Sequence, residues 1–396
     1  MTQNRVLFVD DEPSILAIYQ MLDSFLGDEF KIATASGGEE ALGLVEQSTF
    51  DVVVSDLTMP KMTGVEFLTE VARRSPASAR IVVSGFVDEV SVAKCCMVGH
   101  RYFIKPFDPI ALTGLIQNLS RTKKPPMSKA VHEIIGKIGA LPCPSETFLQ
   151  LTSALNSPTA SIQDISDIVS IDPALTAKVL QIVNSAQFGS ARKITSIMEA
   201  VQMVGLDLVR AIAGGLQIFD FYGRDGKTRA PLGELWKHSL QVAFVAKGIS
   251  EMEGLPNRMC SEAFTIGLLH DVGKLILASN TPDEFRHVLE RASYECKPSH
   301  EIENEIFGSS HAQIGAYLLR LWGLPDTIVT AVESHHSVTR VDYKTFTPFF
   351  MVHMAQCITR SPDLLPPWHF QVAEEFGLTE KLEVWRNAVP SIQRAM

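Results

Sequence analysis

The sequence lacks any long uncharged apolar stretch, so we expect no segment that spans a bilayer. Its first residues combine one arginine with a short apolar run that acidic residues interrupt, which is not the pattern of a secretion signal. None of its 6 cysteines forms a C-x-x-C pair, and this favours buried, reduced thiols. These absences together predict a cytoplasmic protein that does not insert into membranes.

Positive charge is also scarce. Lysine and arginine total 35 against 45 aspartate and glutamate residues, and the formal net charge is -10. This balance, without a basic recognition helix, argues against direct DNA binding. The contents of hydrophobic residues, 46%, and charged residues, 20%, are those of an ordinary folded protein. Because 396 residues are too many for a single hydrophobic core, we expect two or three domains.

Residues 1–120 alternate short apolar runs with amphipathic stretches. The runs lie at 6–9, 31–34, 51–55, 80–84 and 102–104, and the amphipathic stretches near 13–26, 38–47, 64–73, 88–97 and 108–120. Five strands that alternate with five helices predict a doubly wound α/β domain, in which a five-stranded parallel sheet is covered on both faces. A ligand site in such a sheet lies at the carboxyl ends of the strands.

Acidic residues follow two of these strands. Asp10 and Asp11 come after the first run and Asp56 after the third, so we expect the three carboxylates to meet at one sheet edge. A divalent cation would relieve their mutual repulsion, and oxygen ligands suit Mg²⁺. Ser84 and Lys105 close the next two strands, where they could hold the oxygens of a phosphoryl group during transfer to a carboxylate. As an alternative, Asp10 or Asp11 caps the helix that follows.

The rest of the chain is predicted to be helical. A basic segment with two prolines at 121–128 is interpreted as a linker. Helices are expected near 129–139, 145–156, 161–170, 173–185, 195–222, 232–252, 258–278, 282–295, 310–322, 325–336 and 345–359. We therefore predict a multidomain protein in which an all-α helical bundle at 129–340 follows the α/β domain, with a helical extension at 341–396.

The helical part carries a dispersed set of imidazoles with one carboxylate. They are His238, His270, Asp271, His311, His335 and His336. On bundle helices such side chains are suitable ligands for one or two transition metals, and a bound metal could activate water against a phosphoester. The alternative is that each histidine is an ordinary core or surface residue.

Four motifs of the first domain resemble the receiver domain of two-component response regulators. They are Val-Asp-Asp-Glu-Pro at 9–13, Asp-Leu-Thr-Met-Pro-Lys-Met-Thr-Gly at 56–64, Ser-Gly at 84–85 and Tyr-Phe-Ile-Lys-Pro-Phe at 102–107. The resemblance implies a phosphoprotein in which a sensor histidine kinase phosphorylates Asp56. It also implies that Asp11, Asp56 and the carbonyl of Thr58 bind Mg²⁺, with Asp10 assisting through water.

The same resemblance assigns roles to the later strands. It implies that Lys105 contacts the phosphoryl group, and that Ser84 and Tyr102 form the switch that reports phosphorylation. Pro106 resembles the proline that follows a cis peptide bond and shapes the Lys105 loop.

The helical part resembles the HDOD family, a divergent branch of the HD phosphohydrolase superfamily. The matching segments are at 141–144, 171–180, 183–186, 200–206, 267–274, 305–315 and 322–325. Active HD hydrolases carry a further metal-binding aspartate where this chain has Gln356. The related branch that cleaves cyclic dinucleotides has a Gly-Tyr-Pro motif, which is missing after His336. The resemblance therefore implies a signalling or interaction module without catalysis.

We predict a response regulator in which phosphorylation of Asp56 changes the receiver surface near Tyr102. The bundle would then bind or release a downstream protein. Two alternatives stay open: the bundle is a metal-dependent phosphohydrolase or phosphodiesterase gated by the receiver, or it senses a nucleotide without cleaving it. The expected partners are the sensor kinase, the downstream protein and, in a homodimer, a second copy of the chain.

Overall fold

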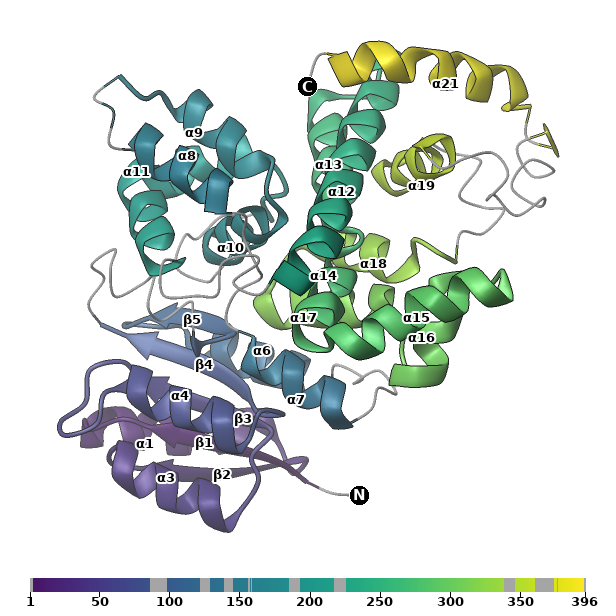
Figure 1. The fold of residues 1–396 in the computed structure, drawn as a ribbon. Helices are drawn as coiled ribbons and strands as arrows, with labels where there is room; N and C mark the ends of the chain where they lie inside the picture. Colours follow the sequence, from purple (N-terminus) through teal and green to yellow (C-terminus); the bar gives the residue numbers. More distant parts are fainter. Residues whose placement is uncertain are drawn as a thin grey trace.

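The computed structural model describes most of the chain. The described residues are 3–85, 98–121, 129–138, 145–155, 157, 159–184, 193–216, 226–337, 346–359, 374–375 and 377–394. Within them a sheet domain is followed by a larger helical part, as the sequence predicts (Figure 1). In these ranges no helix is both long and apolar enough to cross a membrane.

Five parallel strands form the sheet in the order β2-β1-β3-β4-β5. They are β1 (Asn4–Val9), β2 (Phe30–Ala35), β3 (Val52–Asp56), β4 (Ala79–Ser84) and β5 (Arg101–Ile104). Every predicted strand is found, with small shifts at its ends. β3 and β4 are buried along their whole length because helices cover both faces of the sheet.

The helices of the sheet domain differ from the predictions in one place, and one predicted helix cannot be compared. They are α1 (Pro13–Met21), α2 (Asp23–Leu26), α3 (Gly38–Gln47), α4 (Gly64–Arg74) and α6 (Pro109–Arg121). The helix expected at 13–26 is divided into α1 and α2, and the one expected at 88–97 lies outside the described residues. The N-cap of α1 is Glu12, so the alternative role of Asp10 or Asp11 as its cap is wrong.

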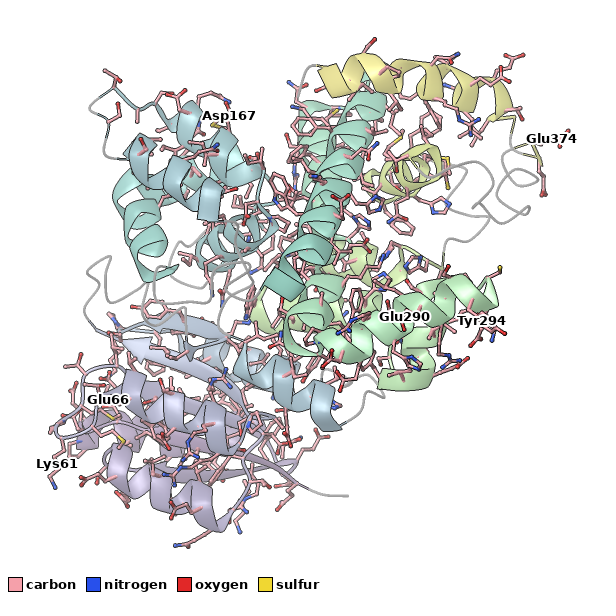
Figure 2. The ribbon with its side chains drawn as sticks, in the orientation of Figure 1. Lys61, Glu66, Asp167, Glu290, Tyr294 and Glu374 are labelled. Carbon is pink, nitrogen blue, oxygen red and sulfur yellow. The ribbon has the colours of Figure 1, made fainter. Side chains whose placement is uncertain are left out.

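The start of α4 is set by a capping box. The hydroxyl of Thr63 accepts a hydrogen bond from the N–H of Glu66, whose side chain is labelled in Figure 2. The Glu66 carboxylate accepts one from the N–H of Thr63 at 2.9 Å. Two main-chain N–H groups at the helix end are thereby paired. This fixes where the loop after Asp56 ends.

The helical part is built around α12, which packs against α13 and α19 (Figure 1). The helices are α7 (Lys129–Lys137), α8 (Ser145–Leu155), α9 (Ile162–Ser170), α10 (Pro173–Val183), α11 (Ile197–Leu216), α12 (Gly226–Met252), α13 (Asn257–Leu269), α14 (Val272–Asn280), α15 (Pro282–Glu295), α16 (Ser299–Phe307), α17 (His311–Trp322), α18 (Asp326–Ser334), α19 (Pro348–Thr359) and α21 (Thr379–Arg394). Most of the 121–128 segment, predicted as a linker, lies outside the described residues.

Two helices of the bundle were predicted incorrectly. The single helix expected at 258–278 is interrupted at His270 and Asp271, where Asp271 has φ -99° and ψ 15°. The sequence also gave no helix at α16, which ends at Gly308 in a left-handed conformation with φ 78°. Both differences affect the histidine cluster, because Asp271 lies at the interruption and Glu303 lies on α16.

Candidate functional sites: an acidic site and a histidine cluster

The carboxyl ends of β1 and β3 bring Asp10 and Asp56 together, as the sequence predicts. Lys105 lies directly after β5, and its Nζ is 2.7 Å from Asp10 Oδ2 and 2.7 Å from Asp56 Oδ1. Both carboxylates are buried, with Asp10 0% and Asp56 5% exposed. The Lys105–Pro106 peptide bond is cis. One ammonium group thus bridges two buried carboxylates at the sheet edge.

The other residues predicted for this site lie around that bridge. The N–H of Thr58 donates to Asp56 Oδ2 at 2.5 Å. Ser84 is buried at the end of β4, and its main-chain oxygen accepts a hydrogen bond from the N–H of Lys105 at 2.7 Å. Tyr102 is buried in β5, whereas Asp11 is exposed in the turn between β1 and α1. The site therefore has a buried floor and one acidic residue on its solvent side.

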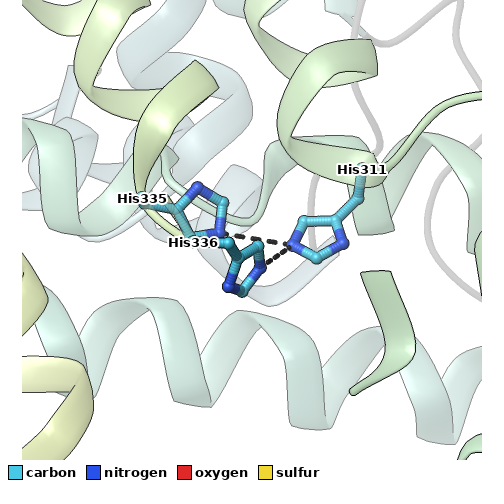
Figure 3. A group of neighbouring side chains, drawn as sticks. All are labelled: His311, His335 and His336. Atoms are coloured by element: carbon cyan, nitrogen blue, oxygen red, sulfur yellow. Dashed lines mark hydrogen bonds between the residues drawn. The ribbon is translucent and has the colours of Figure 1, made fainter. Parts of the chain in front are cut away.

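In the bundle, all six predicted residues meet in one cluster. Their ligand atoms form two groups, and within each group these atoms lie within 4.8 Å of one another. The first group is His238 with His270 and Asp271, and the second, shown in Figure 3, is His311 with His335 and His336. Asp271 joins the two groups. Its Oδ1 lies 3.1 Å from His311 Nε2, and its Oδ2 lies 3.4 Å from His270 Nε2 and 3.9 Å from His238 Nε2.

Hydrogen bonds fix the tautomers of three histidines in this cluster. Nδ1 lies 2.6 Å from the Gly267 carbonyl in His270, 2.7 Å from the Val332 carbonyl in His335 and 2.6 Å from Glu303 Oε2 in His311. These oxygens accept hydrogen bonds, so each Nδ1 carries a proton, and in a neutral ring the Nε2 atom then presents a lone pair.

The Nε2 atoms of the second group lie close to one another. His311 Nε2 lies 3.3 Å from His335 Nε2 and 2.9 Å from His336 Nε2 (Figure 3). His335 Nε2 carries no hydrogen, so the first contact requires a proton on His311 Nε2 or a cation between the two atoms. The imidazole nitrogens of the cluster are therefore arranged as ligands for one cation.

Comparison with known families identifies the two domains that carry these sites. The response regulator receiver domain matches residues 6–117, and the HDOD domain matches residues 141–338, which is half of the 396 residues. The chain belongs to the HDOD family. It joins an N-terminal receiver domain to a C-terminal HDOD domain, the architecture of a two-component response regulator.

Several known proteins resemble this HDOD response regulator, each over only part of one of the two compared chains. The crystal structure of the MmoQ response regulator from Methylococcus capsulatus is 28% identical, with a TM-score of 0.51, and covers 62% of this chain and 98% of its own. The hydrogenase transcriptional regulatory protein HoxA of Cupriavidus necator is 41% identical over 118 residues, 29% of this chain and 24% of HoxA. An uncharacterised protein of Treponema pallidum is 26% identical over 215 residues, 53% of this chain and 40% of that protein. The chain thus spans less than half the length of these two curated relatives.

The electrostatics of the receiver site favour an added cation. Burial raises the pKa of Asp56 above its ordinary value of 3.8 and Asp10 adds to the increase, although Lys105 acts in the opposite direction. Burial would lower the pKa of Lys105, but its hydrogen bonds to Asp10 and Asp56 raise the pKa above 10.5. Because Lys105 does not fully compensate the carboxylates, and all donors are oxygen atoms, the residues fit Mg²⁺, the ion that receiver domains generally use.

The HDOD cluster is electrostatically different. Burial would raise the pKa of Asp271, but His270 and Lys274 hold the pKa well below 3.8. Burial lowers the pKa of His335 to about 3, so this imidazole is neutral at physiological pH. Burial would also lower the pKa of His311, but Glu303 raises it above 6.5. An anionic carboxylate surrounded by imidazole nitrogens is a ligand set that fits a transition metal.

Sequence reasoning gave no role to several neighbours of the two sites. Glu303 from α16 accepts the hydrogen bond of His311, and Lys274 Nζ lies 2.8 Å from Asp271 Oδ2. In the receiver, Tyr19 stacks on Phe8 and Phe107 with ring centroids 4.5 Å and 5.7 Å apart, and its buried hydroxyl makes no hydrogen bond to any residue that the structure describes. Burial, with the charges of Asp10 and Asp56, raises the pKa of that hydroxyl. Tyr19 is therefore part of the acidic site.

Proposed function

We propose that Asp56 accepts a phosphoryl group from a sensor histidine kinase in the cytoplasm, with Mg²⁺ held by Asp10, Asp11, Asp56 and the carbonyl of Thr58. The supporting observation is the position of Lys105 Nζ, 2.7 Å from an oxygen of Asp10 and of Asp56. A carboxylate is a competent nucleophile for phosphoryl transfer. Bound Mg²⁺ would supply positive charge that neutralises the incoming phosphate.

The side chains of the receiver orient the carboxylate for this transfer. The N–H of Thr58 holds Asp56 Oδ2, and Lys105 holds Oδ1. After transfer, the Lys105 ammonium and the Ser84 hydroxyl, at the ends of neighbouring strands, would bind the new phosphoryl oxygens. Tyr102 would then change its packing in β5, and the receiver would shift between two arrangements.

The test is phosphate uptake from acetyl phosphate by the full chain, measured as intact mass. We expect uptake by the wild type in Mg²⁺, no stable uptake by Asp56→Asn, and no uptake in excess chelator. Asp51→Asn is the matched control, because Asp51 lies just before the other end of β3, where its Oδ2 accepts a hydrogen bond from the N–H of Arg5 at 2.8 Å. Equal uptake by Asp56→Asn and Asp51→Asn would refute the assignment.

For the output, we infer that the HDOD domain binds a downstream protein in a phosphorylation-dependent manner and does not catalyse hydrolysis. Two-metal hydrolysis needs enough anionic ligands to hold both cations. Lys274 occupies Asp271 Oδ2 at 2.8 Å, which leaves one oxygen of Asp271 for a metal. Gln356, where active relatives have a carboxylate, is 5% exposed in α19, and within the described part of the chain its Nε2 makes no hydrogen bond.

A second candidate function is the binding of one transition metal. It is supported by the convergence of His311 and His335, whose Nε2 atoms lie 3.3 Å apart. His311, His335, His336 and Asp271 would hold the ion. When bound, it would give the cluster one positive centre and thereby fix the ends of the helices that carry these residues.

Metal content and affinity test this function. We expect protein purified without added metal to bind one equivalent of Mn²⁺, Fe²⁺, Ni²⁺ or Zn²⁺, and His335→Ala to lose most of that affinity. His287→Ala, which removes an exposed histidine of α15, should leave the affinity unchanged. Hydrolysis of a cyclic dinucleotide that disappears in Asp271→Ala would overturn the non-catalytic assignment. In the absence of turnover, a pull-down that compares wild type with Asp56→Asn tests phosphorylation-dependent partner binding.

A further inference from the structure

Arg101, the first residue of β5, reaches from the receiver into the HDOD domain. Its Nη2 donates to the main-chain oxygen of Arg320 at 2.8 Å, in the last turn of α17. Its guanidinium also lies over Gly323, where a Cβ would be 1.3 Å from Arg101 Nη1. Gly323 ends α17 in a left-handed conformation with φ 80°, which glycine adopts without strain. The receiver thus supplies a cation at the negative end of a bundle helix.

Helix α10 holds the segment just before Arg101. Gln181 Nε2 donates to the main-chain oxygen of His100 at 3.1 Å. Gln181 Oε1 in turn accepts from Lys178 Nζ at 2.8 Å, and that ammonium lies 4.5 Å from the ring centroid of Trp322. Residues 99–101 are therefore held between α10 and the end of α17, and in Figure 1 β5 is the strand nearest to the bundle.

The Arg101 charge is buried at some cost. Among the described residues no carboxylate forms an ion pair with Arg101, and its Nε is buried without a hydrogen bond, although the charge of Asp326 acts on it favourably from a greater distance. Burial lowers the pKa of Arg101 to about 10. Because a buried cation without a carboxylate partner is unfavourable, this contact can be released at a small free-energy cost, unlike a well-compensated ion pair.

The other end of α17 is His311, a member of the histidine cluster. Between the two ends, all residues of α17 except Gln313 and Arg320 are buried. A helix of 12 residues is about 18 Å long and, when buried, moves as a rigid body. A displacement at Arg320 would therefore reach His311.

The other end of β5 leads to the phosphorylation site. The strand ends at Ile104, and the next residue, Lys105, bridges Asp10 and Asp56. β5 thus connects the acidic site to Arg101, and α17 connects Arg101 to the histidine cluster.

We infer that Arg101 is a positioning residue that holds α17, and through it His311, in register with the receiver. The part of this inference that concerns signalling rests on the proposed phosphorylation of Asp56. Phosphorylation moves Lys105 and β5, releases Arg101 from Arg320 and loosens the end of α17, so that the histidine cluster and the surface around α17 change together.

The experiment is hydrogen–deuterium exchange of α17 in the full chain. Without phosphodonor, we expect Arg101→Ala to accelerate exchange in peptides covering 311–322 on the order of tenfold, the ratio that corresponds to one charge-assisted hydrogen bond. Arg101→Lys should restore part of the protection, because an ammonium can still reach the Arg320 carbonyl. Arg73→Ala, which removes an exposed arginine paired with Glu70 on α4, should have no effect. Unchanged exchange in Arg101→Ala would overturn the inference.

Acetyl phosphate separates this inference from the proposed function. In wild type it should accelerate exchange of the same peptides, whereas Arg101→Ala should show no further change although its intact mass shows full phosphate uptake. An equal response in both proteins, or no response in a phosphorylated wild type, would refute the coupling. If no protein takes up phosphate, the proposed function fails, while the comparison of wild type with Arg101→Ala still decides whether Arg101 positions α17.

Discussion

His100 is a buried histidine at the junction of the two domains. Its Nδ1 accepts a hydrogen bond from the N–H of Arg80 at 3.1 Å, which requires the neutral ring. Burial, with the charges of Arg80, Arg101 and Lys178, lowers the pKa of His100 well below 6.5. Protonation would place a further cation among these groups and remove the acceptor.

The sign of the resulting pH dependence follows from this lowered pKa. Below pH 6.5 the unfolded chain binds a proton at His100 that the folded protein does not bind. The His100 contribution to stability is therefore complete above that pH and is lost as the pH falls, by at most about 1.4 kcal/mol per pH unit. We expect urea unfolding to show a steeper loss between neutral pH and pH ~5 for wild type than for His100→Asn, which keeps an acceptor near the Nδ1 position. The same dependence of the unfolding free energy on pH in both proteins would contradict a neutral, buried His100.

For single residues, the sequence predicted those whose position follows from the strand that precedes them. Asp10, Asp56 and Lys105 follow strands that the apolar runs identify, and parallel strands place their carboxyl ends together. Glu303 could not be found in this way. It lies on another helix from His311, and the left-handed Gly308 between them breaks any helical spacing. Tyr19 looked like one more apolar residue of an amphipathic helix.

Among the helices, α14 and α17 approach each other most closely at Gly273. A Cβ there would lie 1.9 Å from the main-chain oxygen of His311, so only glycine allows this approach. Through it, the start of α17 lies beside Asp271 at the start of α14. The closeness of the two helix ends places His311 Nε2 3.1 Å from Asp271 Oδ1.

Gly273→Ala should therefore separate the two helices. We expect it to lower the unfolding free energy by about 1–3 kcal/mol, the usual cost of an added group in a packed core, and to weaken metal binding. Gly233→Ala in α12 is the control, because a Cβ there meets nothing within 4 Å. That substitution should stabilise the protein slightly, since alanine favours a helix by up to about 1 kcal/mol. Thermal unfolding and metal titration of both variants measure these two effects. Equal stability and equal metal affinity of Gly273→Ala and Gly233→Ala would refute the steric argument.

The interruption between α13 and α14 shows why the bundle was predicted less well than the sheet. Apolar residues recur at helical spacing on both sides of His270 and Asp271, so periodicity alone suggests one helix. The interruption depends instead on the contacts of Asp271 with Lys274 and the surrounding histidines. Lys274 and His270 are near Asp271 in the sequence, but His311 comes from a distant part of the chain, and that contact leaves no local pattern.

For the whole molecule, the contact between the domains had no signature in the sequence. Arg101, Gln181 and Arg320 are widely separated polar residues, and each is unremarkable in its own segment. α7 adds a second contact, because it packs against α4 of the receiver and places His132 6.3 Å from the ring of Tyr317. The predicted boundaries at 121–128 and 340 stay predictions, but the two parts are not independent bodies.

This contact gives a prediction for a cleaved chain. A specific protease site inserted between 122 and 128 should yield two folded fragments that elute together in size-exclusion chromatography at micromolar concentration. Gln181→Ala removes the hydrogen bond to His100 and should shift the fragments toward separate elution, whereas uncleaved Gln181→Ala should elute like the wild type. Separate elution of the wild-type fragments would show that the contact forms only because the domains share one chain.

The Arg101 contact also limits how this architecture can be inherited. A recombination event that exchanged residues 1–121 for another receiver sequence would keep the acidic site if the new sequence carried its motifs. It would remove the guanidinium at the end of α17 unless the new receiver sequence had a cationic residue at the first position of its last strand. The two domains therefore have to be selected as a pair, and lineages that carry them should exchange them together.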